Sequence, residues 1–418
     1  MGIPGLLPLL KTIQKQVTLK KYVNQTLAID GYAWLHRASC TCAFDLVMGK
    51  PTNKYLQFFI KRLQLLKRLN ITPYVVFDGD SLFVKSHTEM QRKKRRLENE
   101  LMAKKLWSAG DRLNAMEFFQ KSVDVTPEMA KCIIDYCQVH SITYIVAPFE
   151  ADAQMVYLEK MGLIQGIISE DSDLLVFGCK TLITKLNDHG EALEISRDNF
   201  TSLPESFPLG ELSEQQFRNL VCLAGCDYTS GIWKVGLITA MKIVKQHSAM
   251  KDILAQMEQT DKFRLSKTFK QEVEFANYAF QYQRVFCPLS NQITTLNHIP
   301  QPLINCRAEI MKIIGCIGSV VEKRSGIRKD IIDTKNIDHK VYERIAKGEL
   351  NPVDITSKLL NREKKLRIRN PLRANILVGR SDLLKKVPRQ LTVRTQSGTF
   401  NAEIPLESKE VSLYIQAY

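Results

Sequence analysis

The chain has 418 residues, 44% of them hydrophobic, and its 59 lysines and arginines outweigh 44 acids to give a formal net charge of +15. This length allows two or three domains or one large domain, and no apolar run approaches the roughly 18 residues that a membrane helix needs. The basic balance favours a polyanionic partner, either nucleic acid or an anionic membrane surface.

The cysteines are scattered along the chain. There are ten, with no CxxC pair and no cysteine–histidine spacing typical of zinc. We interpret them as reduced, mostly buried thiols of an intracellular protein.

Four short apolar runs in the first half of the chain each lead into acidic residues. The runs are Leu27–Ile29, Tyr74–Phe77, Tyr144–Val146 and Ile167–Ile168. Between the first two, residues 54–70 carry Leu, Phe and Ile at helical spacing, with a basic opposite face. Strands that alternate with helices predict an α/β fold with a mostly parallel central sheet flanked by helices.

A strongly basic segment follows the second run. Residues 88–123 begin TEMQRKKRRLENELMAKK, which is rich in helix formers but carries little apolar stripe. A solvated, salt-bridged helix is the ordinary interpretation of such a charge run. Because this one directly follows an acid-bearing strand end, we favour a helical insertion that contacts phosphates beside the site.

Helices are expected to predominate after Ser213. Leu220–Ala224 and Leu237–Lys245 predict two helices joined by the glycine-bearing turn GCDYTSGIWKVG. The region to about residue 350 is mixed and amphipathic. After about residue 365 the chain becomes basic and loses its periodicity, which predicts a flexible tail.

Carboxylates gather where the predicted strands end. In open parallel sheets, ligands bind at the carboxyl ends of the strands, so acids far apart in sequence are expected to converge there. Within the pairs Glu150/Asp152 and Asp171/Asp173, the i, i+2 spacing places both side chains on one face if the backbone is extended. The seven candidate ligands are Asp30, Asp78, Glu150, Asp152, Asp171, Asp173 and Asp227.

Such a cluster would repel itself unless cations bound it. Oxygen ligands without histidine or cysteine suit Mg²⁺ or Mn²⁺, and two such ions about 4 Å apart are the usual machinery for phosphodiester hydrolysis. The alternative, strand-end acids that only cap helices and pair with Lys or Arg, is competitive for any one acid but poor for seven at matching positions. We therefore predict a two-metal site.

Six motifs, in order along the chain, resemble a known family. MGIPGLLP, AIDGYAWLHR, VVFDGD, APFEADAQ, ISEDSDLLVFG and GCDYTSGI are similar to the 5′-nucleases of the flap endonuclease and exonuclease 1 group, the XPG family. The stretches YLQFFIKRLQLL, DVTPEMAKCIIDYC, ITKLND and YQRVFCPL resemble the exonuclease 1 branch, especially its short, fungal, damage-inducible members. The resemblance covers about residues 1–365.

The resemblance implies a fold and an activity. The fold is a PIN-like 5′-nuclease fold with a helical arch and a helix–two-turn–helix element. The activity is a Mg²⁺-dependent 5′→3′ exonuclease on double-stranded DNA with 5′-flap endonuclease activity in DNA repair, and Mn²⁺ would substitute. The seven acids fall on the family's metal-ligand positions. The implied partner is duplex DNA with 5′ ends, nicks, gaps or flaps.

Further site residues also follow from the resemblance. Lys85 and Arg92 are expected to project from the arch toward the scissile phosphate and to screen its charge. Tyr32 and His36 would meet the unpaired terminal nucleotides, where a tyrosine can stack on a base. Without the family, these two are equally well explained as packing residues. The implied DNA contacts are Gly2, Tyr32, His36, Lys185, Gly231, Val235 and Gly236.

The turn GCDYTSGIWKVG resembles the family's helix–two-turn–helix element. There, backbone N–H groups and a monovalent cation such as K⁺ hold a duplex phosphate away from the cut. Ala224 stands where the family often has a serine that helps to hold the cation, and Trp233 is unusual in this turn. The alternative is a simple packed helical hairpin.

The expected organisation is a nuclease core over residues 1–350 and a basic, flexible tail over 351–418. The core would comprise an N-terminal nuclease region (1–99), the arch (84–125), an internal nuclease region (138–227), the helix–two-turn–helix (220–250) and a helical C-terminal part (251–350). Larger family members bind mismatch-repair partners through a long tail. The short tail here argues against those partners, and we expect a monomer.

The compartment is open between nucleus and mitochondrion. Residues 1–29 carry four lysines and no acid, which permits mitochondrial import. A structural role for Gly2 would argue against removal of a presequence.

Two other functions compete with a nuclease. A catalytically silent DNA-end binder would be expected to have lost some of the seven acids. A PIN-like ribonuclease would share the sheet of acids, but the duplex-gripping hairpin and the basic arch count against it.

Overall fold

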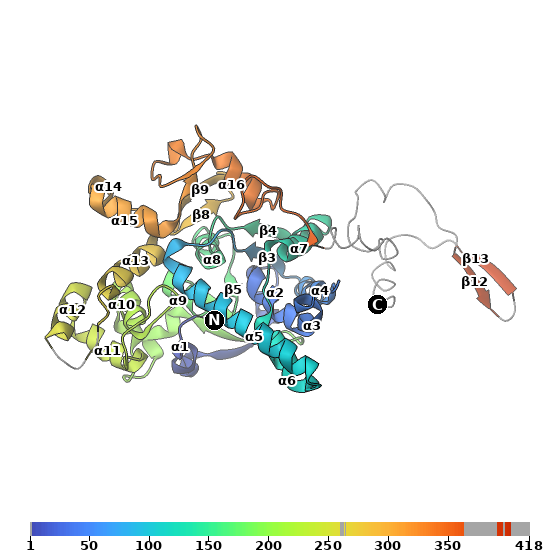
Figure 1. Cartoon of the computed structure of the whole chain (residues 1–418), viewed down its shortest axis with the longest axis horizontal. Helices are drawn as coiled ribbons and strands as arrows, with labels where there is room; N and C mark the ends of the chain where they lie inside the picture. The colour runs from blue at the N-terminus through green and yellow to red at the C-terminus, as the bar shows by residue number, and fades with distance from the viewer. Residues whose placement is uncertain (1, 260–262, 264, 363–390, 396–397, 403–418) are drawn as a thin grey trace. The chain divides into compact units, whose positions relative to one another are not determined.

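The computed structural model describes residues 2–259, 263, 265–362, 391–395 and 398–402 (Figure 1). The chain divides into two units, residues 1–374 and 375–418. The second unit contains an antiparallel hairpin of β12 (Leu391–Thr395) and β13 (Gly398–Ala402). In the described part of the chain, no helix is both long and apolar enough to cross a membrane.

A seven-stranded sheet forms the centre of the first unit, in the order β1-β7-β6-β5-β2-β3-β4. Strands β6, β5, β2, β3 and β4 run parallel, and β7 and β1 add an antiparallel edge. The strands are β1 (Lys15–Thr18), β2 (Thr26–Asp30), β3 (Thr72–Phe77), β4 (Thr143–Val146), β5 (Gly166–Ile168), β6 (Thr181–Thr184) and β7 (Glu191–Ser196). The four predicted strands and the predicted α/β class are confirmed.

Helices cover this sheet because its central strands are apolar on both faces. Helices α2, α4 and α7 pack against one another and against β3 and β4, whereas α8 packs against β2 and β3. The helices up to α9 are α1 (Leu6–Leu9), α2 (Gly31–Ser39), α3 (Ala43–Val47), α4 (Lys54–Arg68), α5 (Ser86–Ser108), α6 (Arg112–Ser122), α7 (Pro127–Val139), α8 (Ala151–Lys160) and α9 (Asp173–Phe177).

The predicted basic insertion is the helical hairpin α5–α6, and α5 crosses the front of the molecule in Figure 1. Ala103 is the one buried residue of α5, as the weak apolar stripe predicts. Ala103 packs with Ala43, Ala115, Phe119 and Val123, so the hairpin is anchored at its α6 end. We call α5 and α6 the arch.

The C-terminal part of the first unit mixes helices with short hairpins. It contains α10 (Glu214–Ala224), α11 (Leu237–Gln246), α12 (Met250–Glu258), α13 (Phe269–Tyr282), β8 (Arg284–Cys287), β9 (Gln292–Thr295), α14 (Gln301–Asn305), α15 (Arg307–Ile317), β10 (Val320–Val321), β11 (Arg328–Lys329) and α16 (His339–Ala346). The C-terminal part 251–350, expected to be helical, also contains the short antiparallel hairpins β8–β9 and β10–β11.

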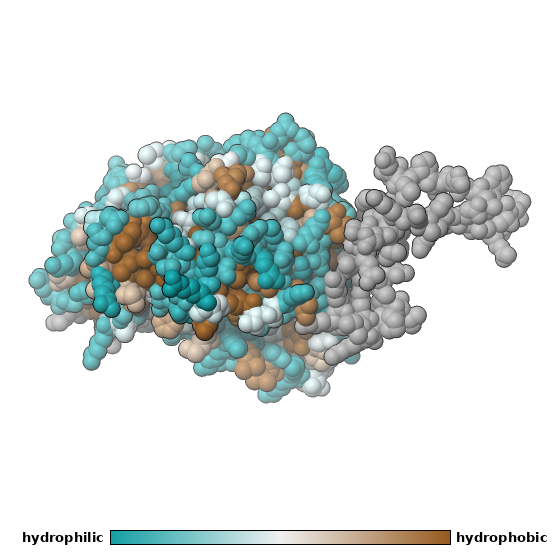
Figure 2. Space-filling model, turned by 90° about the horizontal axis from the view of Figure 1, so that it is seen from above, coloured by the Kyte–Doolittle hydropathy of each residue, from teal (hydrophilic) through white to brown (hydrophobic). Residues whose placement is uncertain are grey.

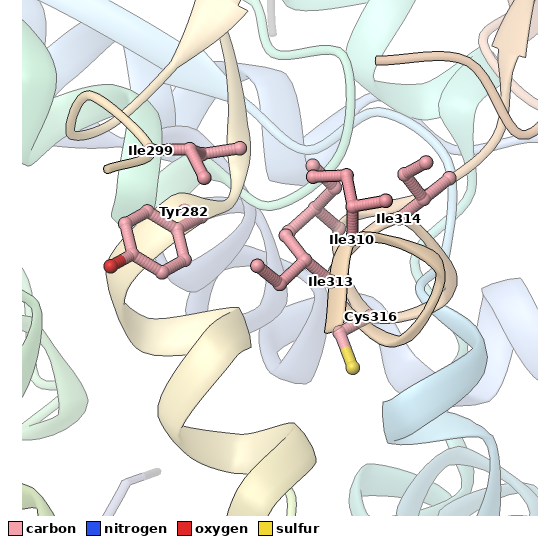
Figure 3. Close-up of a cluster of buried hydrophobic side chains, with 7 residues drawn as sticks. Tyr282, Ile299, Ile310, Ile313, Ile314 and Cys316 are labelled. Carbon is pink, nitrogen blue, oxygen red and sulfur yellow. The ribbon is translucent and has the colours of Figure 1, made fainter. Parts of the chain in front are cut away.

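A separate apolar cluster joins this part to the base of the arch. Figure 3 shows its buried residues, among them Tyr282, Ile299, Ile310 and Ile313. Val84, in the single 3₁₀ turn Phe83–Lys85 that precedes α5, packs against this cluster. The C-terminal helices therefore help to fix the start of the arch.

The ordered core extends beyond the predicted start of the tail at residue 351. Leu359 is buried, and Asn361 Nδ2 donates to Asp135 Oδ2 at 2.6 Å. The predicted boundary is too early, because residues 351–362 pack against the core. Beyond residue 362, only β12 and β13 of the predicted flexible tail lie within the described residues.

The face of the molecule seen in Figure 2 is mainly hydrophilic, with separate hydrophobic patches.

Candidate active site

The seven predicted carboxylates lie where strands end and helices begin. Asp30 ends β2, Asp78 follows β3, and Glu150 and Asp152 open α8. Asp171 and Asp173 follow β5, and Asp227 follows α10. The charge of at least one other acid in the set raises the pKa of each of four members, Asp30, Asp152, Asp171 and Asp173. The structure therefore brings the acids into one electrostatic cluster.

The local geometry of the acid pairs differs from the prediction. Asp173 is the first residue of α9 and Ser172 has helical backbone angles, so Asp171 and Asp173 do not share an extended strand. Asp171 Oδ1 instead accepts the N–H of Asp173 at 2.9 Å, which bends the chain into the helix. Glu150 is extended, but Asp152 already lies in the first turn of α8. Asp152 and Asp173 therefore reach the cluster from the first turns of helices rather than from extended strands.

Backbone and hydroxyl donors hold several of these carboxylates. Asp30 accepts the N–H of Ala33 and the hydroxyl of Ser169, both at 2.8 Å. Asp78 accepts the N–H of Ala151 at the start of α8, at 2.7 Å. The N–H groups at a helix N-terminus favour a negatively charged acceptor. These hydrogen bonds therefore orient the carboxylates but leave their negative charge in place.

Burial and mutual repulsion raise the pKa values of most of the cluster. Burial, then the charge of Asp78, raises the pKa of Asp30 to about 7. Burial raises the pKa of Asp78 to about 6. Burial and the charge of Asp171 raise the pKa values of Asp152 and Asp173 well above the usual range. The cluster therefore holds more negative charge than its own donors can stabilise.

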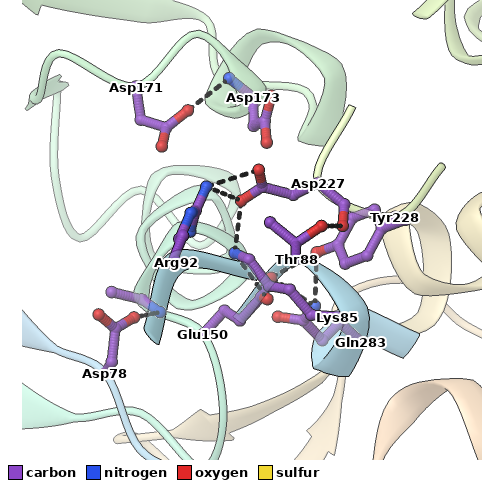
Figure 4. Close-up of polar contacts among 11 residues, drawn as sticks. Asp78, Lys85, Thr88, Arg92, Glu150, Asp171, Asp173, Asp227, Tyr228 and Gln283 are labelled. Carbon is purple, nitrogen blue, oxygen red and sulfur yellow. Dashed lines mark hydrogen bonds and ion pairs between the residues drawn. The ribbon is translucent and has the colours of Figure 1, made fainter. Parts of the chain in front are cut away.

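Lys85, in the turn just before the arch, and Arg92 of α5 supply part of the missing positive charge (Figure 4). Lys85 Nζ lies 3.0 Å from Glu150 Oε1 and 3.0 Å from Asp227 Oδ2. Arg92 Nη2 donates to both oxygens of Asp227, at 2.7 and 2.9 Å. Although burial acts to raise the pKa of Asp227, Lys85 and Arg92 hold it below the usual range. The arch is thus fastened to the acids through its first turns.

The donor set suits a hard divalent cation. It offers only carboxylate oxygens, and Asp173 Oδ1 is buried with no hydrogen-bond donor among the described residues. As arranged in that part of the chain, no group of three or more His, Cys, Asp or Glu side chains could hold a metal ion. Since Lys85 and Arg92 occupy oxygens of Glu150 and Asp227, metal binding requires these side chains to rearrange.

The predicted N-terminal DNA contacts surround the cluster. Gly2 has φ +82°, and a Cβ there would lie 2.5 Å from Asp171 Oδ1. Ile3 N–H donates to Ser172 Oγ at 2.8 Å, which holds the N-terminal residues beside the acids. Tyr32 is half-buried, with its ring edge-to-face to Phe77 at 6.4 Å.

Two further predicted contacts are exposed. His36 lies on α2 and Lys185 follows β6. Lys185 adopts a left-handed backbone (φ +54°), and its N–H donates to Glu170 Oε1 at 2.8 Å. Glu170 therefore points away from the acid cluster, as its sequence position predicts.

The predicted helix–two-turn–helix is present as α10, a turn and α11. Gly231 has φ +69°, and a Cβ there would lie 2.7 Å from Gly225 N, so only glycine fits. Gly236 precedes α11 as its N-cap residue. The N–H of Val235 donates to Ile232 O at 2.9 Å within the turn. The Val235 N–H is thus engaged within the turn, and the DNA contact expected at Val235 stays a prediction.

Sequence reasoning missed two side chains that hold Glu150. Tyr228 Oη donates to Glu150 Oε2, and Gln283 Nε2 donates to the same oxygen at 3.1 Å. Both residues lie in stretches quoted for the family resemblance, GCDYTSGI and YQRVFCPL, but neither was given a role. Since Gln283 is 133 residues from Glu150, no local spacing could have indicated the contact.

Comparison with known proteins identifies two family domains in this chain. The XPG N-terminal domain matches residues 1–99, and the XPG I-region matches residues 141–227. DNA damage-inducible protein DIN7 of Saccharomyces cerevisiae is 75% identical over 412 residues, which cover 99% of this chain and 96% of that protein. Exodeoxyribonuclease 1 of the same yeast is 53% identical over 382 residues, or 91% of this chain and 54% of that protein.

Among solved structures, the catalytic core of Rad2 in complex with DNA substrate is similar, with a TM-score of 0.49 and 20% identity, covering 66% of this chain and 84% of that one. The fold and the two domain matches define a nuclease of the XPG class. More narrowly, the chain belongs to the exonuclease 1 branch of the XPG nuclease family.

Proposed function

We propose that this chain is a Mg²⁺-dependent 5′→3′ exonuclease on double-stranded DNA, with 5′-flap endonuclease activity, that acts in DNA repair and recombination. One observation carries the proposal: Lys85, just before the arch, contacts Glu150 and Asp227, and Arg92 of the arch contacts Asp227, so both cations reach the acid cluster that suits a divalent cation. Phosphate-binding cations and metal-binding acids are thus side by side, as phosphodiester hydrolysis requires.

The chain's own residues have distinct tasks in this proposal. Bound Mg²⁺, or Mn²⁺ in its place, would supply an activated water and stabilise charge on the attacking and leaving oxygens. All seven acids would hold two such ions. Lys85 and Arg92 would exchange their carboxylate partners for oxygens of the scissile phosphate. Tyr32, at the start of α2, would stack on the terminal base.

The duplex would be held away from the cut by the α10–α11 turn. Gly231 and Gly236 would let the backbone approach a phosphate closely, with K⁺ as a possible companion ion. Exposed Lys185 would contact the backbone of the DNA. The substrates would be duplexes with 5′ ends, nicks, gaps or flaps, and the protein would act as a monomer in the nucleus or the mitochondrion.

Cleavage of labelled DNA by the purified protein tests this proposal. A recessed-end duplex and a 5′-flap duplex, each labelled at either end in separate reactions, are incubated with Mg²⁺. Stepwise removal from the 5′ end and cutting at the flap junction are expected from the wild type. Asp173→Ala should abolish both and leave DNA binding largely intact, because Asp173 holds metal rather than DNA. Asp252→Ala, an exposed acid at the start of α12, is the matched control.

Two results would contradict the proposal. If Asp173→Ala cleaves DNA within a few-fold of the wild-type rate, Asp173 is not a metal ligand and the assigned metal site is wrong. No cleavage by wild type, together with tight binding to both DNAs, would instead identify a silent DNA-end binder.

A further inference from the structure

Glu150 is held on one side by two donors that lie outside both matched XPG stretches. Gln283 is fully buried between α13 and β8, and its Nε2 lies 3.1 Å from Glu150 Oε2 and 3.3 Å from Tyr228 Oη. Tyr228 Oη donates to the same Oε2 (Figure 4). The other oxygen, Oε1, lies 3.0 Å from Lys85 Nζ. The two donors therefore fix which oxygen of Glu150 is turned toward the cations.

The position of Gln283 is itself set by packing. The backbone carbonyl of Gln283 accepts the N–H of Leu296 at 2.9 Å, and Gln283 is the residue directly after α13. Phe280 of α13 packs edge-on against the Tyr228 ring, at 4.9 Å between centroids and 84°. Helix α13 thus supplies the surface that orients the Tyr228 ring, and the residue that follows it supplies the Gln283 amide.

An amide at this buried position is costly for stability. Gln283 Oε1 is buried and has no hydrogen-bond donor among the described residues. Such an unpaired buried acceptor destabilises the fold, and an apolar side chain of similar length would avoid that cost. The hydrogen bond from the Gln283 side-chain NH₂ group to Glu150 explains why an amide, rather than an apolar side chain, occupies this position.

We propose that Gln283 is a positioning residue for metal binding. With Tyr228, it holds Glu150 Oε2 so that Oε1 is presented to the divalent cation once Lys85 withdraws. This inference rests on the proposed function, in which Glu150 is a metal ligand. Residues that orient a metal ligand typically contribute 10–100-fold to metal affinity.

Direct Mn²⁺ binding without DNA, measured by isothermal titration calorimetry, tests the role. Gln283→Met keeps the length of the side chain but removes the donor. We expect its Mn²⁺ affinity to fall about tenfold or more. Its melting temperature in EDTA should not fall below that of wild type, because the unpaired Oε1 is removed with the amide, and its cleavage rate should recover at saturating Mn²⁺. Tyr228→Phe should change Mn²⁺ affinity in the same direction.

Gln281→Met is the matched control, since the Gln281 amide donates only within α13, to Asn277 O. A merely structural Gln283 predicts a lower melting temperature with unchanged Mn²⁺ affinity in the folded fraction, and that result would overturn the inference. If Gln283→Met does not fold, unchanged Mn²⁺ affinity in Tyr228→Phe would overturn it equally. Failure of the wild type to bind Mn²⁺ or to cleave DNA would reject the proposed function itself. Equal Mn²⁺ binding by an active wild type and Gln283→Met would reject only the positioning role.

Discussion

Arg92 donates to both carboxylate oxygens of Asp227, at 2.7 and 2.9 Å. The contact joins the second turn of the arch to the residue that follows α10, 135 positions later in the chain. Thr88 Oγ1 adds a bond to Asp227 O at 2.8 Å. The arch and the α10–α11 turn thus meet at Asp227, so a shift of the arch would also change the geometry of this acid.

Arg92→Ala should lower single-turnover cleavage about 10²-fold, since a preorganised cationic donor is lost from the scissile phosphate. Arg92→Lys should recover only part of this rate, because a lysine cannot make the two-point contact. DNA affinity should change much less than the rate. A rate equal to wild type in Arg92→Ala would show that the arch does not reach the phosphate.

Gly2→Ala should strongly reduce cleavage and metal affinity, because the added Cβ would lie 2.5 Å from Asp171 Oδ1 and 2.6 Å from Ser172 N. Gly5→Ala is the control. Gly5 has nearly the same φ, +83°, but a Cβ there meets only Leu237 Cδ1 at 3.9 Å. Gly5→Ala should therefore cost only the backbone strain, about 1 kcal/mol, and keep most of the activity. Equal losses in the two variants would mean that backbone strain alone is responsible.

The sequence predicted the acid cluster because strand-end acids of a parallel sheet must share one edge. Asp30 ends β2 and Asp78 directly follows the neighbouring parallel strand β3, so the strand pattern alone was enough to predict that these two acids lie close together. The fine geometry of Asp171 and Asp173 was not predictable from spacing, since a side-chain bond to the Asp173 N–H decides between strand and helix. Local hydrogen bonds of this kind compete with extended backbone and leave no periodic signal.

The contacts that the sequence could not indicate are those between distant segments. Gln283 meets Glu150 only after α13 and the sheet have packed, and Val84 meets the C-terminal cluster in the same way. The turn bond from Val235 to Ile232 also depends on backbone angles that residue types do not specify. Tertiary packing therefore decides which neighbouring groups remain available for ligands.

Trp233→Ala should weaken duplex binding several-fold without lowering the melting temperature. Trp233 lies in the α10–α11 turn with 72% of its surface exposed, so the fold gains little from it. Lys234 beside it is exposed and left-handed (φ +64°), which places a cation on the same turn. Burial of the indole against DNA would contribute to affinity. Fluorescence anisotropy with a duplex and with single-stranded DNA checks this, and an equal loss for both DNAs would contradict a duplex contact.

The stability of the metal-free protein should rise as the pH falls from about 8 to about 5. Burial raises the pKa of Asp30 to about 7 and that of Asp78 to about 6, above the ordinary value of 3.8 for an aspartate. Between the ordinary and the raised values, the folded state binds more protons than the unfolded state, so the free energy of unfolding falls as the pH rises.

Asp30→Asn removes one of these titrating groups; its single side-chain oxygen can accept the N–H of Ala33, and its NH₂ group then donates to the hydroxyl oxygen of Ser169. In EDTA at pH 8 its melting temperature should exceed that of wild type, and the difference should shrink by about pH 5, where the wild-type carboxyl is protonated in the folded state. Mg²⁺ should raise the melting temperature of wild type at pH 8 and reduce this difference, because the bound cation neutralises the same charge. A difference between the two proteins that does not vary with pH would show that Asp30 is not held at a raised pKa.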